Sequence, residues 1–129
     1  MPALVVDTDV FSFVFKRDTR AAVYWPHLSG RNLHVSFSTV AELYRWSVKN
    51  GWGAKRIADL AATLRHYTVL VYDEQMAWRW AEVMSIPGVP VGHGDAWVAA
   101  AALRHGYPLV THNRKDFEGI PGLAVISEA

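Results

Sequence analysis

Four carboxylates occupy similar positions relative to apolar runs of the chain: Asp7, Glu42, Asp95 and Asp116. Crowded carboxylates repel one another and raise each other's pKa, and a divalent cation relieves that repulsion. A site of oxygen ligands alone, without cysteine and without a histidine pair at ligand spacing, suits Mg²⁺ or Mn²⁺ better than Zn²⁺. Such an ion lowers the pKa of a water molecule and stabilises charge on a leaving oxygen, which is the chemistry of phosphodiester hydrolysis.

Each acid taken alone also has an ordinary structural interpretation. Glu42 stands three residues after Thr39, as in a T-x-x-E capping box, and an acid at a helix start, such as Asp95, is favoured by the helix dipole. Asp116 could be an ordinary loop acid. Asp7 is harder to explain, because a carboxylate directly after a buried strand is costly unless it is paired. The joint occurrence of the four favours a shared site.

The elements that must position these acids alternate between strands and helices. Apolar runs predict strands, and periodic stretches and capping signals predict helices. The predicted strands cover 4–6, 33–37, 69–71, 109–111 and 124–126. Two helices are predicted to begin at Val10 and at about Thr19, the second disturbed by Pro26. A third begins at Ser38 or Thr39 and ends near Gly51, and a fourth begins at about Ala54. The last two run from Glu74 to about Met84 and from Asp95 to Arg104, with Gly106 as the stop, and residues 87–94 between them are expected to form a loop. This alternation predicts a three-layer α/β/α fold with a central parallel sheet of four to five strands, whose carboxyl ends gather the ligands.

The bulk properties narrow the class of protein. The chain has 129 residues, 51% of them hydrophobic, and no cysteine, which predicts a single domain (1–129) without disulfides or a thiolate metal site. Neither a signal peptide nor an apolar stretch long enough to span a bilayer is visible, so a cytoplasmic protein without membrane contact is expected. The formal net charge of +1 carries little information about partners.

Four segments together resemble the signature segments of PIN domains, and most closely those of the VapC ribonuclease toxins of bacterial toxin–antitoxin pairs. They are VVDTDVFS (5–12), STVAELYR (38–45), PVGHGDAWVAAAAL (90–103) and LVTHNRKDFEGIPGLAVI (109–126). The resemblance implies an endoribonuclease that cleaves transfer or ribosomal RNA with Asp7, Glu42, Asp95 and Asp116 around Mg²⁺ or Mn²⁺. It also implies a VapB-like antitoxin partner, bound near the helices of 39–65, and a homodimer within a larger toxin–antitoxin assembly.

The same resemblance assigns supporting residues. Thr8 matches a small polar residue beside the first acid, and Thr111 and Asn113 match a T-x-N signature that supports the loop of Asp116. Asp9 departs from the more usual Asn or Ser and is interpreted as a helix cap, with an outer carboxylate of the metal site as the alternative. Trp97 stands where some members carry a further acid, which leaves the number of metal ions open.

Basic and aromatic residues suggest further contacts. The main candidates for contacts with RNA phosphates are Arg114, Lys115 and Arg45. Weaker candidates are Lys49, Lys16 and Arg17, and an ordinary solvated surface charge is the alternative for each. His93 and His112 flank two of the acids. They are expected to support the metal ligands or to face the substrate, with an ordinary surface role as the alternative. In a metal-free mechanism they would act as an acid–base pair. Trp78 and Trp80 are two residues apart, so one of them is expected to be exposed.

Three alternatives to the toxin remain open from the residues. The DTDVF segment resembles the opening of haloacid dehalogenase-like phosphatases, with Asp7 as nucleophile and Asp9 as acid–base. A PIN-like domain that binds RNA or a partner without cleaving is the non-enzymatic alternative, although the four acids are all present. A free-standing housekeeping nuclease would use the same chemistry as the toxin.

Overall fold

The structure, a computed structural model, describes residues 2–89 and 91–129. Its centre is a single parallel sheet in the order β3-β2-β1-β4-β5. The strands are β1 (Ala3–Val6), β2 (Asn32–Ser36), β3 (Thr68–Leu70), β4 (Leu109–Val110) and β5 (Val125–Ile126). Every pairing is parallel, with Leu4 opposite Leu33 and Val6 opposite Val110. The predicted parallel sheet of four to five strands is therefore confirmed, with five.

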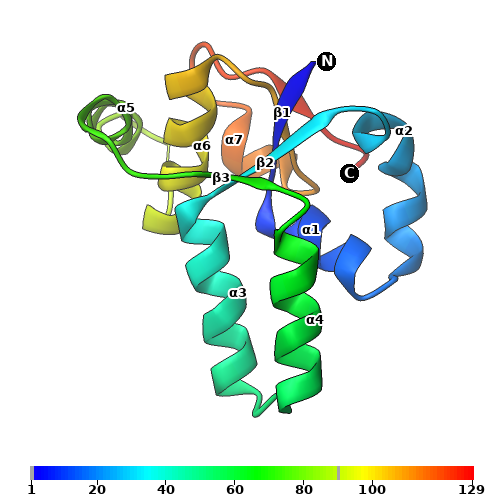
Figure 1. Cartoon of the computed structure of the whole chain (residues 1–129). Coiled ribbons are helices and arrows are strands. Elements are labelled where there is room, and N and C mark those ends of the chain that lie inside the picture. Colours follow the sequence, from blue (N-terminus) through cyan, green and yellow to red (C-terminus); the bar gives the residue numbers. More distant parts are fainter. Residues whose placement is uncertain (1, 90) are drawn as a thin grey trace.

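Helices cover both faces of the sheet (Figure 1). They are α1 (Thr8–Phe15), the 3-10 helix η1 (Thr19–Val23), α2 (Trp25–Leu28), α3 (Phe37–Lys49), α4 (Ala54–Leu64), α5 (Glu74–Met84), α6 (His93–His105) and α7 (Arg114–Phe117). Alternation along β1 divides the core: Leu4 and Val6 pack with α1–α4, whereas Val5 packs with α5–α7. Two apolar layers thus enclose the sheet, as in a three-layer α/β/α fold.

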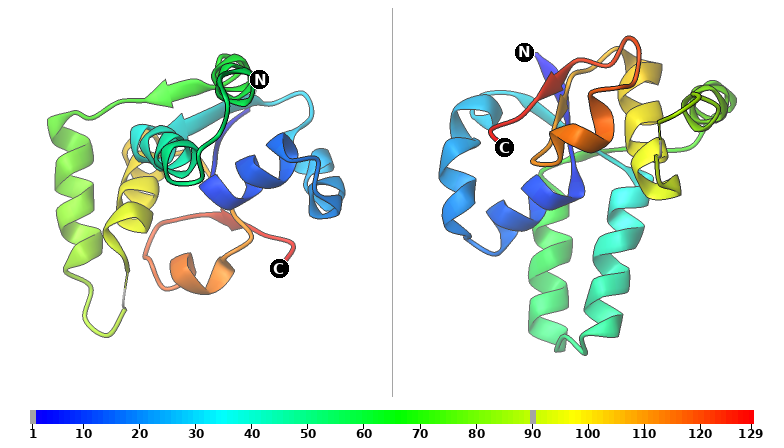
Figure 2. Two further views of the ribbon diagram at one scale, coloured as in Figure 1. Left: turned by 90° about the horizontal axis from the view of Figure 1, so that it is seen from below. Right: turned by 180° about the vertical axis from the view of Figure 1, so that it is seen from behind.

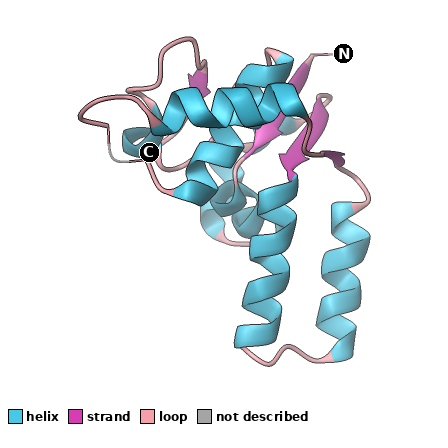
Figure 3. Ribbon diagram, turned by 90° about the vertical axis from the view of Figure 1, so that its left-hand side faces the viewer, coloured by secondary structure: helices cyan, strands magenta, loops and turns pink. Residues whose placement is uncertain are grey.

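The long helices α3 and α4 form a hairpin that projects away from the sheet (Figure 3). Seen from below, both are viewed nearly end-on, with α1 next to them and α7 beyond α1 (Figure 2, left). Leu60 and Leu64 of α4 are buried against the sheet layer. None of the helices in the described ranges has the length and apolarity needed to cross a membrane.

Local signals explain several helix boundaries. Asp73 caps α5, because its side chain accepts a hydrogen bond from the Met76 amide at 2.7 Å. Gly106 ends α6 in the left-handed conformation with φ 69°, which glycine adopts without a steric penalty. The predicted range of α5 and the predicted stop at Gly106 are confirmed.

The predicted start of α3 was wrong. The strand before it ends at Ser36, and Ser36 rather than Ser38 or Thr39 is the N-cap, accepting a hydrogen bond from the Ser38 amide. The T-x-x-E capping box is therefore absent, and Glu42 lies in the second turn. The sequence SFST offers several hydroxyl side chains that could cap, so propensity alone did not select among them.

Other boundaries shifted by one or more residues. The helix predicted to begin at Val10 starts at Thr8, and the one predicted at Asp95 starts at His93. The disturbed helix near Pro26 is two short helices, and Pro26 lies in the first turn of α2, where its missing N–H costs nothing. β3 and β5 cover 68–70 and 125–126, β4 ends at Val110, and Asp116 lies in the short helix α7 rather than in a loop. In the predicted loop 87–94, Pro90 lies outside the described residues.

Candidate functional site

Asp7 stands at the carboxyl end of β1 and is the N-cap of α1. Its carboxylate is buried and accepts hydrogen bonds from the Thr8 amide at 2.8 Å and from the Thr111 hydroxyl at 2.7 Å. Burial, followed by repulsion from Asp9, raises the pKa of Asp7 to about 7, although both hydrogen bonds act against the rise. Asp7 is thus a buried acid whose charge is incompletely compensated.

Glu42 reaches the same region from α3. The Thr8 hydroxyl lies 3.0 Å from the Thr39 hydroxyl and 3.4 Å from Glu42 Oε2, so Thr8 ties α1 to α3. Burial raises the pKa of Glu42, whereas the contact with Thr8 and the charge of Arg45 lower it. The neighbouring hydroxyl therefore orients Glu42 toward the end of β1.

Asp95 and Asp116 complete the acidic group from the other face of the sheet. Burial raises the pKa of Asp95 to about 6, and repulsion from Asp116, then Glu42 and Asp9, adds to the rise. Asn113 donates a hydrogen bond from Nδ2 to Asp116 Oδ2 at 2.8 Å. Asp95 on α6 is therefore within electrostatic range of Glu42 on α3 and Asp116 on α7.

The acids interact electrostatically, but they do not form a preassembled metal-coordination site. Among residues 2–89 and 91–129, no three acidic or histidine side chains already stand at metal-ligand spacing. Their raised pKa values nevertheless mark unrelieved negative charge, and oxygen ligands are those that Mg²⁺ and Mn²⁺ prefer. The acidic group therefore fits a hard divalent cation, provided that the side chains move closer when the ion binds.

Asp9 does not cap α1, contrary to the prediction, because Asp7 takes that position. The Asp9 carboxylate instead accepts hydrogen bonds from the Val10 amide at 2.7 Å and the His112 amide at 3.1 Å. Burial raises its pKa. Asp9 thereby fastens the segment after β4 to α1.

A buried tyrosine that the sequence did not single out holds the same segment from behind. The Tyr24 hydroxyl lies 2.6 Å from His112 Nδ1 and accepts a hydrogen bond from the Glu128 amide at 3.1 Å. The ring of Phe13 packs edge-on against His112. Since the two contacts of Tyr24 join residues 88 and 104 positions apart, no local pattern could have revealed them.

Replacing Tyr24 with Phe is expected to destabilise the protein by about 2 kcal/mol, because His112 and the Glu128 amide lose a buried partner. Chemical denaturation monitored by tryptophan fluorescence measures the change. Tyr72→Phe is the matched control, since Tyr72 is 61% exposed. Equal stability of the two variants would contradict this account of Tyr24.

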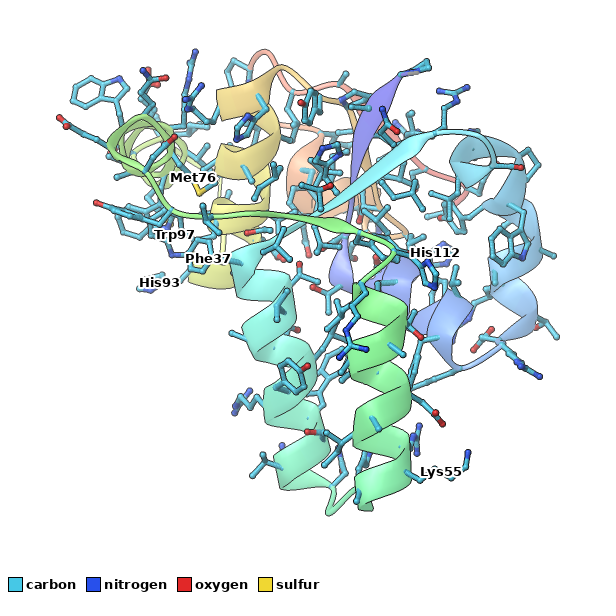
Figure 4. All side chains as sticks on the ribbon, in the orientation of Figure 1. Phe37, Lys55, Met76, His93, Trp97 and His112 are labelled. Atoms are coloured by element: carbon cyan, nitrogen blue, oxygen red, sulfur yellow. The ribbon has the colours of Figure 1, made fainter. Side chains whose placement is uncertain are left out.

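His93 and His112 do not form a pair. His93, the first residue of α6, packs against Trp80, whereas His112 packs against Phe13 of α1, and Figure 4 shows the two histidines well apart. Paired acid–base cleavage by these two histidines is therefore excluded by their separation.

Aromatic side chains pack beside Asp95 at the edge of the acidic group. Trp97 stacks on Trp80 with ring centroids 5.2 Å apart and meets Phe37 edge-on at 5.4 Å; Phe37 and Trp97 lie together in Figure 4. Trp78 is 67% exposed while Trp80 packs against the core, which confirms that one of the two faces solvent. Trp97 thus has a packing role.

The three main candidates for RNA contact are exposed. Arg114 and Lys115 lie in α7 beside Asp116, and Arg114 reaches the Ser127 carbonyl at 3.4 Å. Arg45 lies on α3 one turn after Glu42 and acts electrostatically on it. All three are placed on elements that carry an acid of the group.

Comparison with known proteins agrees with this architecture. The chain is 28% identical over 124 residues to "Ribonuclease VapC1" of Haemophilus influenzae strain R2866, covering 92% of each, and 27% identical over 128 residues to the "tRNA(fMet)-specific endonuclease VapC" of Salmonella typhimurium, covering 97% of each. Its fold superposes on a chain of the solved DNA-bound VapBC of Salmonella typhimurium with a TM-score of 0.85 and 26% identity, covering 98% of each.

The PIN domain family matches residues 4–123, a range that contains all four acids and the strands that place them. Since this match spans nearly the whole sequence, the chain belongs to the PIN-domain family.

Proposed function

We propose that the protein is a VapC-type endoribonuclease toxin that hydrolyses RNA with Mg²⁺ or Mn²⁺ and is neutralised by a cognate antitoxin. One observation carries the proposal: the buried carboxylate of Asp7 lies at the carboxyl edge of a parallel sheet, where burial and repulsion from Asp9 and Asp95 raise its pKa. A protein retains such an unfavourable arrangement when the acids serve a ligand. The curated VapC relatives support RNA as the substrate.

The acids would have two roles, metal binding and proton transfer, according to their surroundings. Asp7, Asp95 and Asp116 would hold the cation with Glu42, because Asp95 is repelled by Asp116 and Glu42 and in turn raises the pKa of Asp7. When bound, the cation supplies a Lewis acid that lowers the pKa of water and stabilises negative charge on phosphate oxygens. Glu42, whose pKa burial raises and whose Oε2 Thr8 holds, is suited to accept a proton and return it.

The supporting residues would fix this geometry. Thr111 donates to Asp7 and accepts from the Asn113 amide, while Asn113 in turn holds Asp116. One chain of hydrogen bonds therefore couples two acids that stand 109 residues apart in sequence. Arg114, Lys115 and Arg45 would bind RNA phosphates around the acids.

The phosphatase alternative has less support. It needs Asp9 as a free acid–base, but the Asp9 carboxylate is occupied by the amides of Val10 and His112. The complete acidic group likewise disfavours a domain that binds RNA without cleaving it. The VapBC structure of Salmonella typhimurium supports a VapB-like antitoxin as the partner. The proposal also includes a homodimer as the base of this toxin–antitoxin assembly and the cytoplasm as its location.

Purified protein is expected to cleave total RNA in the presence of Mg²⁺ or Mn²⁺ and to lose this activity in EDTA, because the cation supplies the Lewis acid. Denaturing gels measure the cleavage, and returning Mn²⁺ to the EDTA-treated protein should restore it. Circular dichroism of the EDTA-treated sample checks that the fold survives. Cleavage that continues without metal would contradict the mechanism.

A further inference from the structure

A basic pocket lies on the α3–α4 hairpin, away from the four acids. Its lining is Lys16, Trp46, Lys49, Asn50, Trp52 and Arg56, and it encloses about 570 Å³. The residues come from the end of α1, the end of α3, the connecting turn and the start of α4. Three of the six are cationic and none is acidic. The basic pocket is therefore a place of concentrated positive charge in a chain whose net charge is only +1.

Two tryptophans hold two of the three cations of the basic pocket in place. The Arg56 guanidinium lies 3.9 Å from the centroid of the Trp52 ring, and Lys16 Nζ lies 5.8 Å from that of Trp46. Trp52 is itself stacked on Phe15, with centroids 6.0 Å apart. Because cation–π contact fixes a long side chain without neutralising it, these charges are ordered and still available to an anion.

The positive charge is not cancelled by neighbouring acids. Within residues 2–89 and 91–129, neither Lys49 nor Arg56 forms an ion pair. Two acids in or beside these elements have other partners: Asp59 pairs with Lys55 at 3.4 Å, and Asp18 pairs with Arg20 at 2.8 Å. An unneutralised cationic surface attracts a polyanion.

The basic pocket and the acids share one helix. Lys49 follows Glu42 by seven residues, which is about two turns and roughly 10 Å along α3, on nearly the same face. Exposed Arg45 lies between them. The hairpin projects from the carboxyl edge of the sheet (Figures 1 and 3). A single strand of nucleic acid that crosses the acids could therefore continue along α3 to the basic pocket.

We propose that the basic pocket binds the phosphate backbone of the RNA substrate a few nucleotides from the phosphate that is cut. The proposal rests on the proposed function, because it takes RNA as the ligand. The resemblance to VapC toxins places the antitoxin near the same helices. RNA is favoured over such a protein segment in the basic pocket itself because the two indoles are already engaged with cations, which leaves charge rather than apolar surface to offer. This second contact would supply affinity and register, while the acids supply the chemistry.

Direct binding tests the proposal without requiring cleavage. The probe is a fluorescein-labelled single-stranded RNA of about 16 nucleotides, the upper end of the length that one domain covers when it binds a single strand. Binding is measured by fluorescence anisotropy in EDTA, so that the RNA is not cleaved. The double variant Lys49→Ala/Arg56→Ala is compared with Lys55→Ala/Arg79→Ala, which removes the same charges from residues that pair with Asp59 and Glu82. Circular dichroism confirms that both variants fold.

The pocket variant is expected to raise the Kd about tenfold and to reduce the slope of log Kd against log salt by roughly 1.4, about 0.7 for each lost contact with a single strand. The control should stay near the wild type. If the pocket variant binds RNA as the wild type does, the surface serves another partner, such as a protein, and the proposal is wrong. If the wild type itself fails to bind RNA, the proposed function fails instead.

Discussion

Replacing Asp7 with Asn is expected to reduce RNA cleavage by at least about 10³-fold. Asp7 accepts hydrogen bonds from Thr8 and Thr111, and Asn keeps its shape while removing the negative charge that would hold the cation. Loss of the cation would remove several kcal/mol of stabilisation of the transition state, and each 1.4 kcal/mol corresponds to a factor of about ten. Single-turnover cleavage of a labelled RNA in Mn²⁺ measures the loss.

Asp59→Asn is the matched control for this experiment. Asp59 lies on α4, is exposed, and pairs with Lys55 at 3.4 Å, so its charge is not part of the acidic group. Its cleavage rate should stay within about twofold of the wild type, as is usual for surface substitutions. A variant at Asp7 that retained full activity would refute the role proposed for the acids, whatever the behaviour of the control.

The arrangement of the fold could be predicted because its signals are local and repeated. Short apolar runs separated by helical stretches admit few topologies other than a parallel sheet with helices on both faces. The stop of α6 followed from one residue with a strong preference for that position, Gly106, and the range of α5 was also predicted. Boundaries failed where neighbouring residues compete, as at Ser36, Ser38 and Thr39.

The nearness of the acids followed from the rule that ligands gather at the carboxyl ends of parallel strands. The repulsion that raises the pKa of Asp95 agrees with that expectation, whereas the catalytic roles of the acids stay predictions. The contacts of Tyr24 and Asp9 with His112 could not be predicted, because they depend on how distant segments meet. Asp9 was interpreted as a helix cap because the sequence does not reveal its long-range contact with the His112 amide.

The metal-free protein is expected to lose stability as pH rises from about 4 to 7. Asp7 has a pKa of about 7 in the folded protein against 3.8 for the ordinary group, so the folded state binds more protons between these values. The free energy of unfolding then falls with rising pH. The penalty is absent below about pH 4 and complete above about pH 7, and it approaches roughly 4 kcal/mol at 1.36 kcal/mol per pKa unit.

Denaturant unfolding in EDTA across this pH range, with wild type and Asp7→Asn in parallel, measures the effect. The difference between the two curves isolates Asp7, because histidines such as His105, whose pKa burial lowers, contribute equally to both. The variant should be the more stable protein above pH 7. Adding Mn²⁺ at pH 8 should then stabilise only the wild type, by about 2.7 kcal/mol at a hundred times its Kd. Parallel curves would mean that the buried carboxylate is already compensated, and the main argument for a cation at Asp7 would be lost.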